Sequence, residues 1–378
     1  MPRGSGSRLD WAVPPVSCDL IVSTRRLDRV IEHAAGDLVV SAQAGVRLDD
    51  LAAVLASAGQ RLALDPPEPA GTIGGLIATN LTSALRYRYG APRDLLIGIT
   101  VVRADGTIAH SGGKVVKNVA GYDIGKLFAG SYGTLGLITE ATFRLHPLPE
   151  ASTWITLTCD TPAAAASAGH AIADSPLTPA AIELDWPSIS APLTIGALFE
   201  GDPDSVEERA ARLADILTRQ TAGQPSAHTK RADGRPGHLP LPAEDDSGRE
   251  SEATLLRVAF WPGQLEAVLL AVRSAASDAG IDLYVSGSAA AGVLEVGIST
   301  GAAPAVAQFV TALRASLEGL GDGLPPSRSS AVVLYAPAAV RDVVDLWGPV
   351  PSLALMRSVK DQFDPKRRMA PGRFAGGI

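Results

Sequence analysis

Glycine is concentrated in three short segments near the start of the chain. Residues 112–139 contain seven glycines, and two further clusters stand at 71–75 and 3–7. Glycine lets a backbone approach a ligand closely or adopt a positive φ. Successive free backbone N–H groups form concavities that bind anions. Each cluster alone is also compatible with a turn or with tight strand packing. Together the three clusters predict one extended phosphate-bearing ligand, held mostly by main chain.

Two common nucleotide-binding motifs are missing from these segments. Gly112-Gly113-Lys114 is followed by valine, where a P-loop requires serine or threonine. The glycines at 133 and 136 do not complete a G-x-G-x-x-G pattern that opens a helix. The sequence therefore disfavours both a P-loop NTPase and an ordinary Rossmann dinucleotide domain.

Six longer motifs follow one another along the chain: RGSGS at 3–7, AGVRLDDL at 44–51, PPEPAGTIGG at 66–75, YGAPRDLLIG at 89–98, GGKVVKNVAGYD at 112–123 and GSYGTLGLIT at 130–139. Their order resembles the FAD-binding domain of the vanillyl-alcohol oxidase family, also called the PCMH type. The tail, with Phe-Asp-Pro at 363–365 and Ala-Pro-Gly-Arg at 370–373, resembles that family's closing D-P-x-x-x-x-N-P-G-R. Tyr132 replaces a glutamate common in catalytic members and resembles the FAD-binding E subunits of bacterial glycolate oxidases (GlcE-like). Ala370 replaces the usual asparagine.

This resemblance implies that FAD is the cofactor, and it implies a set of contacts. The loop at 3–7 would take the pyrophosphate, the segment 67–80 would follow the ribityl chain and ring, and residues near 130–138 would lie by the phosphates and adenine. The loop at 3–7 has no histidine or cysteine, so non-covalent FAD is expected. For Lys117, Asn118 and Tyr122 a purely structural role remains an equal alternative. The implied cofactor-binding residues are Arg3, Gly4, Ser5, Gly6, Ser7, Pro67, Gly71, Thr72, Gly74, Gly75, Asn80, Lys117, Asn118, Tyr122, Gly130, Ser131, Gly133, Leu137 and Ile138.

Catalytic residues cannot be assigned from the sequence. Oxidation of a 2-hydroxy acid needs a base for the hydroxyl proton and a cationic clamp for the carboxylate. Catalytic members of the resembled family carry a histidine-rich metal motif where residues 287–300 read GSAAAGVLEVGIST, with Glu295 the sole ligand type present. No metal is therefore expected. Arg86, Arg88 and Arg93 are clamp candidates, although surface charge or ion pairs within the FAD domain are the favoured explanation for them.

Composition excludes several other classes. The net charge of −7 gives no support for nucleic-acid binding. The two cysteines, at 18 and 159, form no disulfide framework and no iron–sulfur spacing. No apolar run is long enough for a membrane span, and the first residues lack the apolar stretch of a signal peptide. We expect a cytoplasmic protein, with membrane association only through partners.

The hydrophobic pattern predicts an α+β fold in three parts. The resemblance implies that residues 1–150 are the PCMH-type FAD-binding domain, and the pattern predicts a hairpin around Asp105-Gly106 within it. Residues 151–335 read as a cap in the order βαββα and then βαββαβ. This order predicts two ferredoxin-like halves sharing one antiparallel sheet. Residues 220–252 are expected to be a mobile linker, and 336–378 to return to the FAD domain.

Individual elements follow from the same periodicities. Strands are expected at 37–42, 62–64, 97–103, 107–110, 135–145, 153–159, 181–185, 193–200, 254–260, 283–286, 294–299 and 330–334. Helices are expected at 48–58, 162–173, 205–219, 263–279, 304–317 and 351–363, with a loop and short helix over 119–127.

The beginning of the chain departs from the resembled family. That family has a strand–helix–strand unit before its pyrophosphate loop, whereas Met1 here stands two residues before Arg3. We therefore expect an N-terminally incomplete FAD domain in which residues 3–7 fray for lack of pairing partners.

The resemblance implies an FAD-dependent oxidoreductase subunit of a glycolate oxidase-like complex. It would act with a catalytic flavoprotein subunit and an iron–sulfur subunit in oxidising a small 2-hydroxy acid such as glycolate or lactate. A self-sufficient FAD-linked oxidase of a hydroxy acid or alcohol is the second possibility. A structural subunit without FAD is the third.

Overall fold

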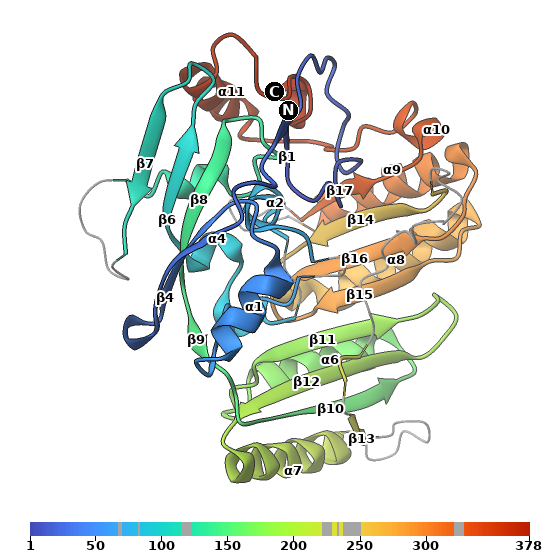
Figure 1. The fold of residues 1–378 in the computed structure, drawn as a ribbon. Coiled ribbons are helices and arrows are strands. Elements are labelled where there is room, and N and C mark those ends of the chain that lie inside the picture. The colour runs from blue at the N-terminus through green and yellow to red at the C-terminus, as the bar shows by residue number, and fades with distance from the viewer. Residues whose placement is uncertain are drawn as a thin grey trace. The chain divides into compact units, whose positions relative to one another are not determined.

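The computed structural model describes residues 1–66, 70–81, 84–114, 122–220, 229–232, 234–236, 251–320 and 329–378. It divides into two compact units, which are treated separately below (Figure 1). Unit 1 comprises residues 1–85, 89–148 and 349–378, and unit 2 comprises 86–88 and 149–348. The last 30 residues thus belong to the same unit as most of the first 148.

Unit 1 is built on a five-stranded antiparallel sheet in the order β3-β4-β8-β6-β7. The hairpin of β6 and β7 turns at Asp105-Gly106, where Gly106 has φ +87°, as expected for this dipeptide. The strands are β3 (Val30–Ala34), β4 (Val39–Gln43), β6 (Leu96–Val102), β7 (Ile108–Gly112) and β8 (Leu137–Arg144); β5 (Gln60–Arg61) pairs with β9 (His146–Pro147) beside it.

Helices cover this sheet and close its core. In α1, Leu48, Leu51 and Leu55 recur at helical spacing and are buried. Phe128 of α5 and Phe363 of α11 pack edge to face, with ring centroids 5.5 Å apart. The helices of unit 1 are α1 (Leu48–Ala56), α2 (Ile73–Thr79), α4 (Pro92–Leu95), α5 (Gly125–Phe128) and α11 (Leu353–Phe363), with 3-10 turns η1 (Ala35–Asp37) and η3 (Ala375–Gly377); α3 (Arg86–Tyr89) lies where the chain passes between the units.

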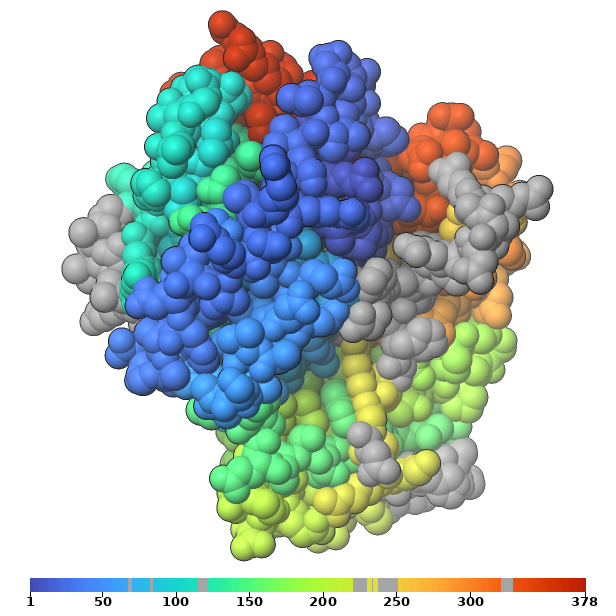
Figure 2. Space-filling model, in the orientation of Figure 1, coloured from blue at the N-terminus to red at the C-terminus, as the bar shows by residue number. Residues whose placement is uncertain are grey.

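The start of the chain is paired, so the expectation that it would fray is wrong. β1 (Pro2–Arg3) runs parallel to β2 (Val22–Ser23), and the amino group of Met1 donates to Leu20 O. Thr24 N donates to Arg3 O at 2.9 Å. The two termini lie close together in unit 1, where Arg373 contacts Met1, and part of the blue N-terminal region adjoins the red C-terminal region on the face shown (Figures 1 and 2). The sequence pattern missed these contacts because they join residues about twenty positions apart in a loop without periodicity.

Unit 2 contains one eight-stranded antiparallel sheet in the order β13-β10-β12-β11-β15-β16-β14-β17. β11 and β15 join its two halves, with Glu183 opposite Ser288. This confirms the α+β fold with a large antiparallel sheet. The strands are β10 (Ala151–Cys159), β11 (Ala181–Trp186), β12 (Leu193–Gly201), β13 (Thr229–Ala232), β14 (Thr254–Ala259), β15 (Tyr284–Ser288), β16 (Val293–Ile298) and β17 (Ser330–Tyr335).

Four long helices of unit 2 pack as one layer against this sheet, since α6 contacts α7 and α8, and α8 contacts α9 (Figure 1). Thr161 caps α6 by accepting a hydrogen bond from Ala164 N, and Gly280 ends α8 with φ +65°. No helix in the described part of the chain is long and apolar enough to span a bilayer. The helices are α6 (Pro162–Ala173), α7 (Pro203–Gln220), α8 (Leu265–Ala279), α9 (Ala303–Gly319) and α10 (Ala338–Arg341), with the 3-10 turn η2 (Pro262–Gln264).

Two expected features differ from the structure. Part of the segment expected to be a linker forms β13, an edge strand whose Arg231 donates to Thr153 Oγ1 at 2.9 Å and contacts Glu207. The hydrophobic pattern did not predict this strand, because its side chains are polar, as suits a solvent-facing sheet edge. The strand expected at 62–64 lies instead at Gln60–Arg61. Here the pairing partner, β9, decides the position.

Candidate functional site

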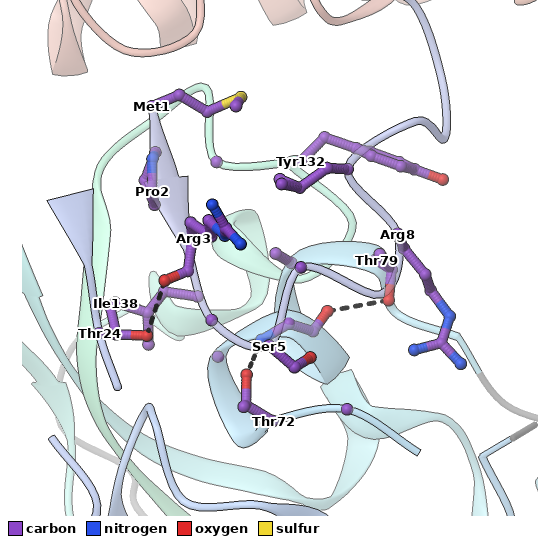
Figure 3. Close-up of a pocket in the computed structure, with 18 of the residues that line it drawn as sticks. Met1, Pro2, Arg3, Ser5, Arg8, Thr24, Thr72, Thr79, Tyr132 and Ile138 are labelled. Atoms are coloured by element: carbon purple, nitrogen blue, oxygen red, sulfur yellow. Dashed lines mark hydrogen bonds between the residues drawn. The ribbon is translucent and has the colours of Figure 1, made fainter. Parts of the chain in front are cut away.

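A pocket in unit 1 is lined by the three glycine-rich segments that lie far apart in sequence. Figure 3 shows side chains of the N-terminal loop, of α2 and of the turn at Tyr132 arranged around it. The lining residues are Met1, Pro2, Arg3, Gly4, Ser5, Gly6, Ser7, Arg8, Leu9, Thr24, Gly71, Thr72, Gly74, Gly75, Ala78, Thr79, Tyr132, Gly133, Gly136, Leu137, Ile138 and Arg373.

The N-terminal loop approaches α2 closely. An added Cβ at Gly4 would stand 2.3 Å from Thr72 Oγ1, so a larger residue there would displace the loop. Gly6 has φ +90°, a conformation that strongly favours glycine. Ser5 Oγ and Ser7 Oγ lie 3.3 Å apart. The loop therefore presents two neighbouring hydroxyl groups to the pocket. Its backbone conformation and its close approach to α2 require small residues.

The second wall is the start of α2. Thr72 precedes this helix with extended backbone, and its Oγ1 accepts a hydrogen bond from Gly75 N at 3.4 Å. Thr79, one turn later, donates to Gly75 O at 2.9 Å (Figure 3). Gly71 has φ +81°. These bonds hold the glycines of the second cluster at the pocket surface.

The third wall is the turn before β8. Tyr132 and Gly133 both have positive φ, +52° and +77°. Tyr132 N donates to Ala78 O at 2.9 Å, which ties this turn to α2. Leu137 and Ile138 at the start of β8 complete the wall.

The charge of the pocket is positive. Arg3, Arg8 and Arg373 are among the lining residues, and no lining residue in the described part of the chain is acidic. Burial lowers the pKa of the Arg373 guanidinium, and nearby Tyr132 and Asp10 oppose that shift. A guanidinium stays protonated in proteins even so. A pocket of glycine main chain, hydroxyls and guanidinium groups suits an anionic ligand such as a dinucleotide.

Most of the expected cofactor-binding residues meet in this pocket. Asn80 ends α2, where its Oδ1 accepts a hydrogen bond from Arg93 N. The Ser131 hydroxyl is buried and donates to Phe128 O, and Gly130 N donates to Ile77 O. Tyr122 is 92% exposed. These four do not line the pocket, and Pro67, Lys117 and Asn118 lie outside the described residues.

Several lining residues were not on the expected list. Arg8 and Leu9 directly follow the RGSGS motif, and Thr79 follows Gly75 by four positions on a helix. These three residues could therefore have been inferred from the sequence. Thr24 reaches the pocket through the pairing of β1 with β2, and Arg373 from the far end of the chain. No local pattern reports such contacts.

Unit 2 carries buried charge on its sheet. Arg235 pairs with Glu183 at 2.6 Å, and Arg257 pairs with Glu295 at 3.0 Å. Burial raises the pKa of Glu295, against the opposing effects of Arg257, Arg235 and Arg86. Ser288 Oγ is buried without a hydrogen-bond partner among the described residues. Glu183 stands opposite Ser288 on β11 and β15, and Arg257 stands opposite Glu295 on β14 and β16; these four residues are called the polar cluster of unit 2.

The three arginines considered as clamps have different surroundings. Arg86 is partly buried and acts electrostatically on Glu295. Arg88 is exposed and donates to Thr178 O at 3.4 Å, and the side chain of Arg93 is exposed. Within the described ranges no group of histidine, cysteine, aspartate and glutamate has a metal-binding arrangement.

Known proteins match the chain at both ends. Residues 1–112 match the model of the FAD binding domain, and residues 347–374 match the C-terminal domain of FAD linked oxidases. Glycolate oxidase subunit GlcD of Bacillus subtilis is 36% identical over 194 residues, covering 50% of this chain and 41% of that protein. Glycolate oxidase subunit GlcE of Escherichia coli is 36% identical over 152 residues, covering 40% and 43%. A D-lactate dehydrogenase of Archaeoglobus fulgidus is 36% identical over 145 residues, covering 38% and 32%.

A solved structure extends the similarity to the whole fold. Alkyldihydroxyacetonephosphate synthase matches with a TM-score of 0.68 over 99% of this chain and 72% of its own, at 19% identity. The sequence matches above cover less than half of each relative. The chain thus resembles FAD-linked oxidoreductases in two parts, a PCMH-type FAD-binding domain at its start and the C-terminal segment of FAD-linked oxidases at its end.

Proposed function

We propose that the pocket of unit 1 binds FAD and that the chain is the FAD-binding subunit of a glycolate oxidase-like complex. One observation carries the proposal. Three glycine-rich segments, which lie within residues 3–7, 71–75 and 132–138, line one positively charged pocket, and two of them fall within the match to the FAD binding domain. Main-chain N–H groups and arginines are the usual partners of a pyrophosphate.

The residues of the pocket fit a long phosphate-bearing cofactor. At Gly75 an added Cβ would meet nothing nearer than Thr72 Oγ1 at 3.4 Å, so the space beside this glycine is open. Ser5, Ser7 and Arg8 would hold the pyrophosphate, and the segment from Gly71 to Gly75 would lie along the remainder of the cofactor. Bound FAD would supply the hydride acceptor. The chain's own residues bind and orient it.

Non-covalent attachment is part of this proposal. No lining residue of the pocket in the described part of the chain is a histidine or cysteine, the side chains that commonly attach to a flavin. Acid precipitation of the loaded protein should release all flavin into the supernatant. Flavin retained on the precipitated chain would refute this attachment mode.

The substrate class and partners are inferred from the relatives. GlcD and GlcE are named as glycolate oxidase subunits, and other relatives as D-lactate dehydrogenases. We infer that electrons from a 2-hydroxy acid pass through this FAD between a catalytic flavoprotein subunit and an iron–sulfur subunit. The isolated, FAD-loaded chain should then leave glycolate and D-lactate unoxidised, even with an artificial acceptor. Rapid turnover that chelators do not inhibit would overturn the subunit role.

The polar cluster of unit 2 supports a second candidate, a self-sufficient oxidoreductase. Arg257 and the buried Ser288 hydroxyl could orient a small carboxylate substrate there. Anaerobic addition of glycolate or D-lactate to the loaded chain separates the two candidates. Bleaching of the flavin without partners supports self-sufficiency, and an unchanged oxidised spectrum supports the subunit. Failure of the chain to take up FAD would instead support a purely structural role.

A further inference from the structure

Lys360 and Asp364 form an ion pair in the interior of unit 1. Lys360 Nζ lies 2.7 Å from Asp364 Oδ2, and both side chains have 0% of their surface exposed. They are one helical turn apart, at the end of α11 and directly after it. Lysine is almost never fully buried unless it is paired. Burying two charges costs solvation energy that their attraction only partly offsets, so stability alone is a weak explanation for this pair.

Every donor of the buried ammonium has a partner. Besides Asp364, Lys360 Nζ donates to Thr134 O at 2.6 Å and to Met369 O at 3.1 Å. An ammonium has three N–H donors, so these bonds use all of them. The carboxylate of Asp364 in turn accepts from Arg368 N and Met369 N. The pair therefore links residues within the C-terminal segment. It also binds one backbone carbonyl outside that segment, that of Thr134.

That carbonyl belongs to a turn that forms one wall of the pocket. Tyr132 and Gly133, which directly precede Thr134, line the pocket and have positive φ. A tyrosine keeps such a conformation only where its surroundings over-determine it. Thr134 N donates to Ser131 O at 3.0 Å, and Tyr132 N donates to Ala78 O. The bond from Lys360 adds a main-chain constraint from the C-terminal segment, beside the ring of Phe374, whose centroid lies 6.1 Å from that of Tyr132.

Arg373 of the same segment binds the N-terminal loop, which forms another wall of the pocket. Its guanidinium donates to Arg8 O at 3.3 Å and to Trp11 O at 3.0 Å, and it is 4% exposed. The stretch from Lys360 to Arg373 thus contacts the main chain of both the N-terminal loop and the Tyr132 turn. These contacts join residues more than 200 positions apart.

We propose that Lys360 is a positioning residue for the cofactor: by holding Thr134 O it sets the Tyr132–Gly133 turn and thereby the affinity of the pocket for FAD. Asp364 acts through Lys360 by orienting its ammonium. The inference rests on the proposed function, since it takes FAD as the ligand of the pocket.

The test compares two lysine substitutions in the full-length apoprotein. Lys360→Met combined with Asp364→Asn removes both buried charges, while the asparagine oxygen can still accept from one of the two backbone donors, Arg368 N or Met369 N. Lys126→Met is the matched control, because Lys126 forms an exposed ion pair with Asp123 and does not line the pocket. Binding is measured by titrating each apoprotein with FAD, well below its melting temperature.

We expect the FAD dissociation constant to rise about tenfold or more in the double variant and to stay unchanged in Lys126→Met. Backbone amides of residues 131–134 should exchange hydrogen faster in the double variant. If that variant does not fold, Lys360→Met alone, in which Asp364 still accepts from Arg368 N and Met369 N, should show the same direction of change. If the double variant folds and binds FAD with wild-type affinity, the role of Lys360 is only structural and the proposal is wrong. Absence of saturable binding by the wild-type chain would instead overturn the proposed function and this inference with it.

Discussion

Gly74 and Gly75 are neighbours in α2 and both line the pocket, yet a side chain at each would meet opposite surroundings. A Cβ at Gly74 would stand 3.0 Å from Ala44 Cβ and 3.1 Å from Ala44 O, in the interior of the unit. A Cβ at Gly75 would meet only Thr72 Oγ1, at 3.4 Å. Gly74 is therefore needed by the fold, whereas Gly75 leaves space that the fold does not use.

This contrast predicts opposite results for one substitution at the two positions. Gly75→Ala should stabilise the apoprotein by up to about 1 kcal/mol, because alanine favours a helix, and should weaken FAD binding about tenfold. Gly74→Ala should lower the melting temperature of the apoprotein, since a backbone carbonyl cannot easily give way. Melting curves and FAD titrations of both variants measure this. Unchanged affinity in Gly75→Ala would show that the ligand does not approach this glycine.

The two cysteines should react very differently. Burial, with the nearby charge of Asp160, raises the pKa of the Cys159 thiol to about 11, whereas Cys18 is exposed. Since the thiolate is the reactive form, a disulfide reagent at about pH 8 should label one thiol per native chain and two per unfolded chain. Cys18→Ser should leave the native protein unlabelled. Rapid native labelling of that variant would contradict the burial of Cys159.

Asp364 should make the protein sensitive to acid. Burial raises the pKa of its carboxyl, but hydrogen bonds from Lys360, Arg368 N and Met369 N lower it further, so the net pKa lies below the ordinary value. A carboxyl whose pKa is lowered by folding contributes stability above its unfolded pKa and loses it as the pH falls through its folded pKa. The contribution is thus complete at neutral pH and is lost below about pH 4.

The corresponding variant is Asp364→Asn. At neutral pH it should be less stable than the wild type by about 3 kcal/mol, because Lys360 is left buried without its counter-ion. As the pH falls from about 6 to about 3, the free energy of unfolding should decline less in the variant than in the wild type. Urea unfolding at each pH provides the measurement. Parallel curves for the two proteins would mean that Asp364 does not titrate with folding.

Much of the fold could be predicted from periodicity, because most elements bury one face. The helix expected at 162–173 has those bounds in the structure, where Thr161 caps it and Pro162 opens it. The repeated βαββ order could also be recognised because its strands and helices bury one face, and it predicted the large antiparallel sheet. β13 escaped prediction because an edge strand with polar side chains has no hydrophobic pattern.

The candidate site was predictable only in part. The glycines at 4, 6, 71, 74 and 75 were visible because conformational freedom is a property of the residue type. Lys360 and Arg373 were not, because a lysine on an amphipathic helix is usually solvated and its burial here depends on Thr134, 226 residues away. Contacts of that range are decided by tertiary packing.

The most direct test of the central claim is the FAD content of the purified chain. Protein incubated with excess FAD and freed of unbound ligand should retain a flavin absorption spectrum with about one FAD per chain, as expected for a single saturable pocket. Acid should release that flavin completely, and the Gly75→Ala variant should retain less after the same wash. A wild-type chain that folds but emerges colourless from this procedure would contradict the assignment of the pocket to FAD.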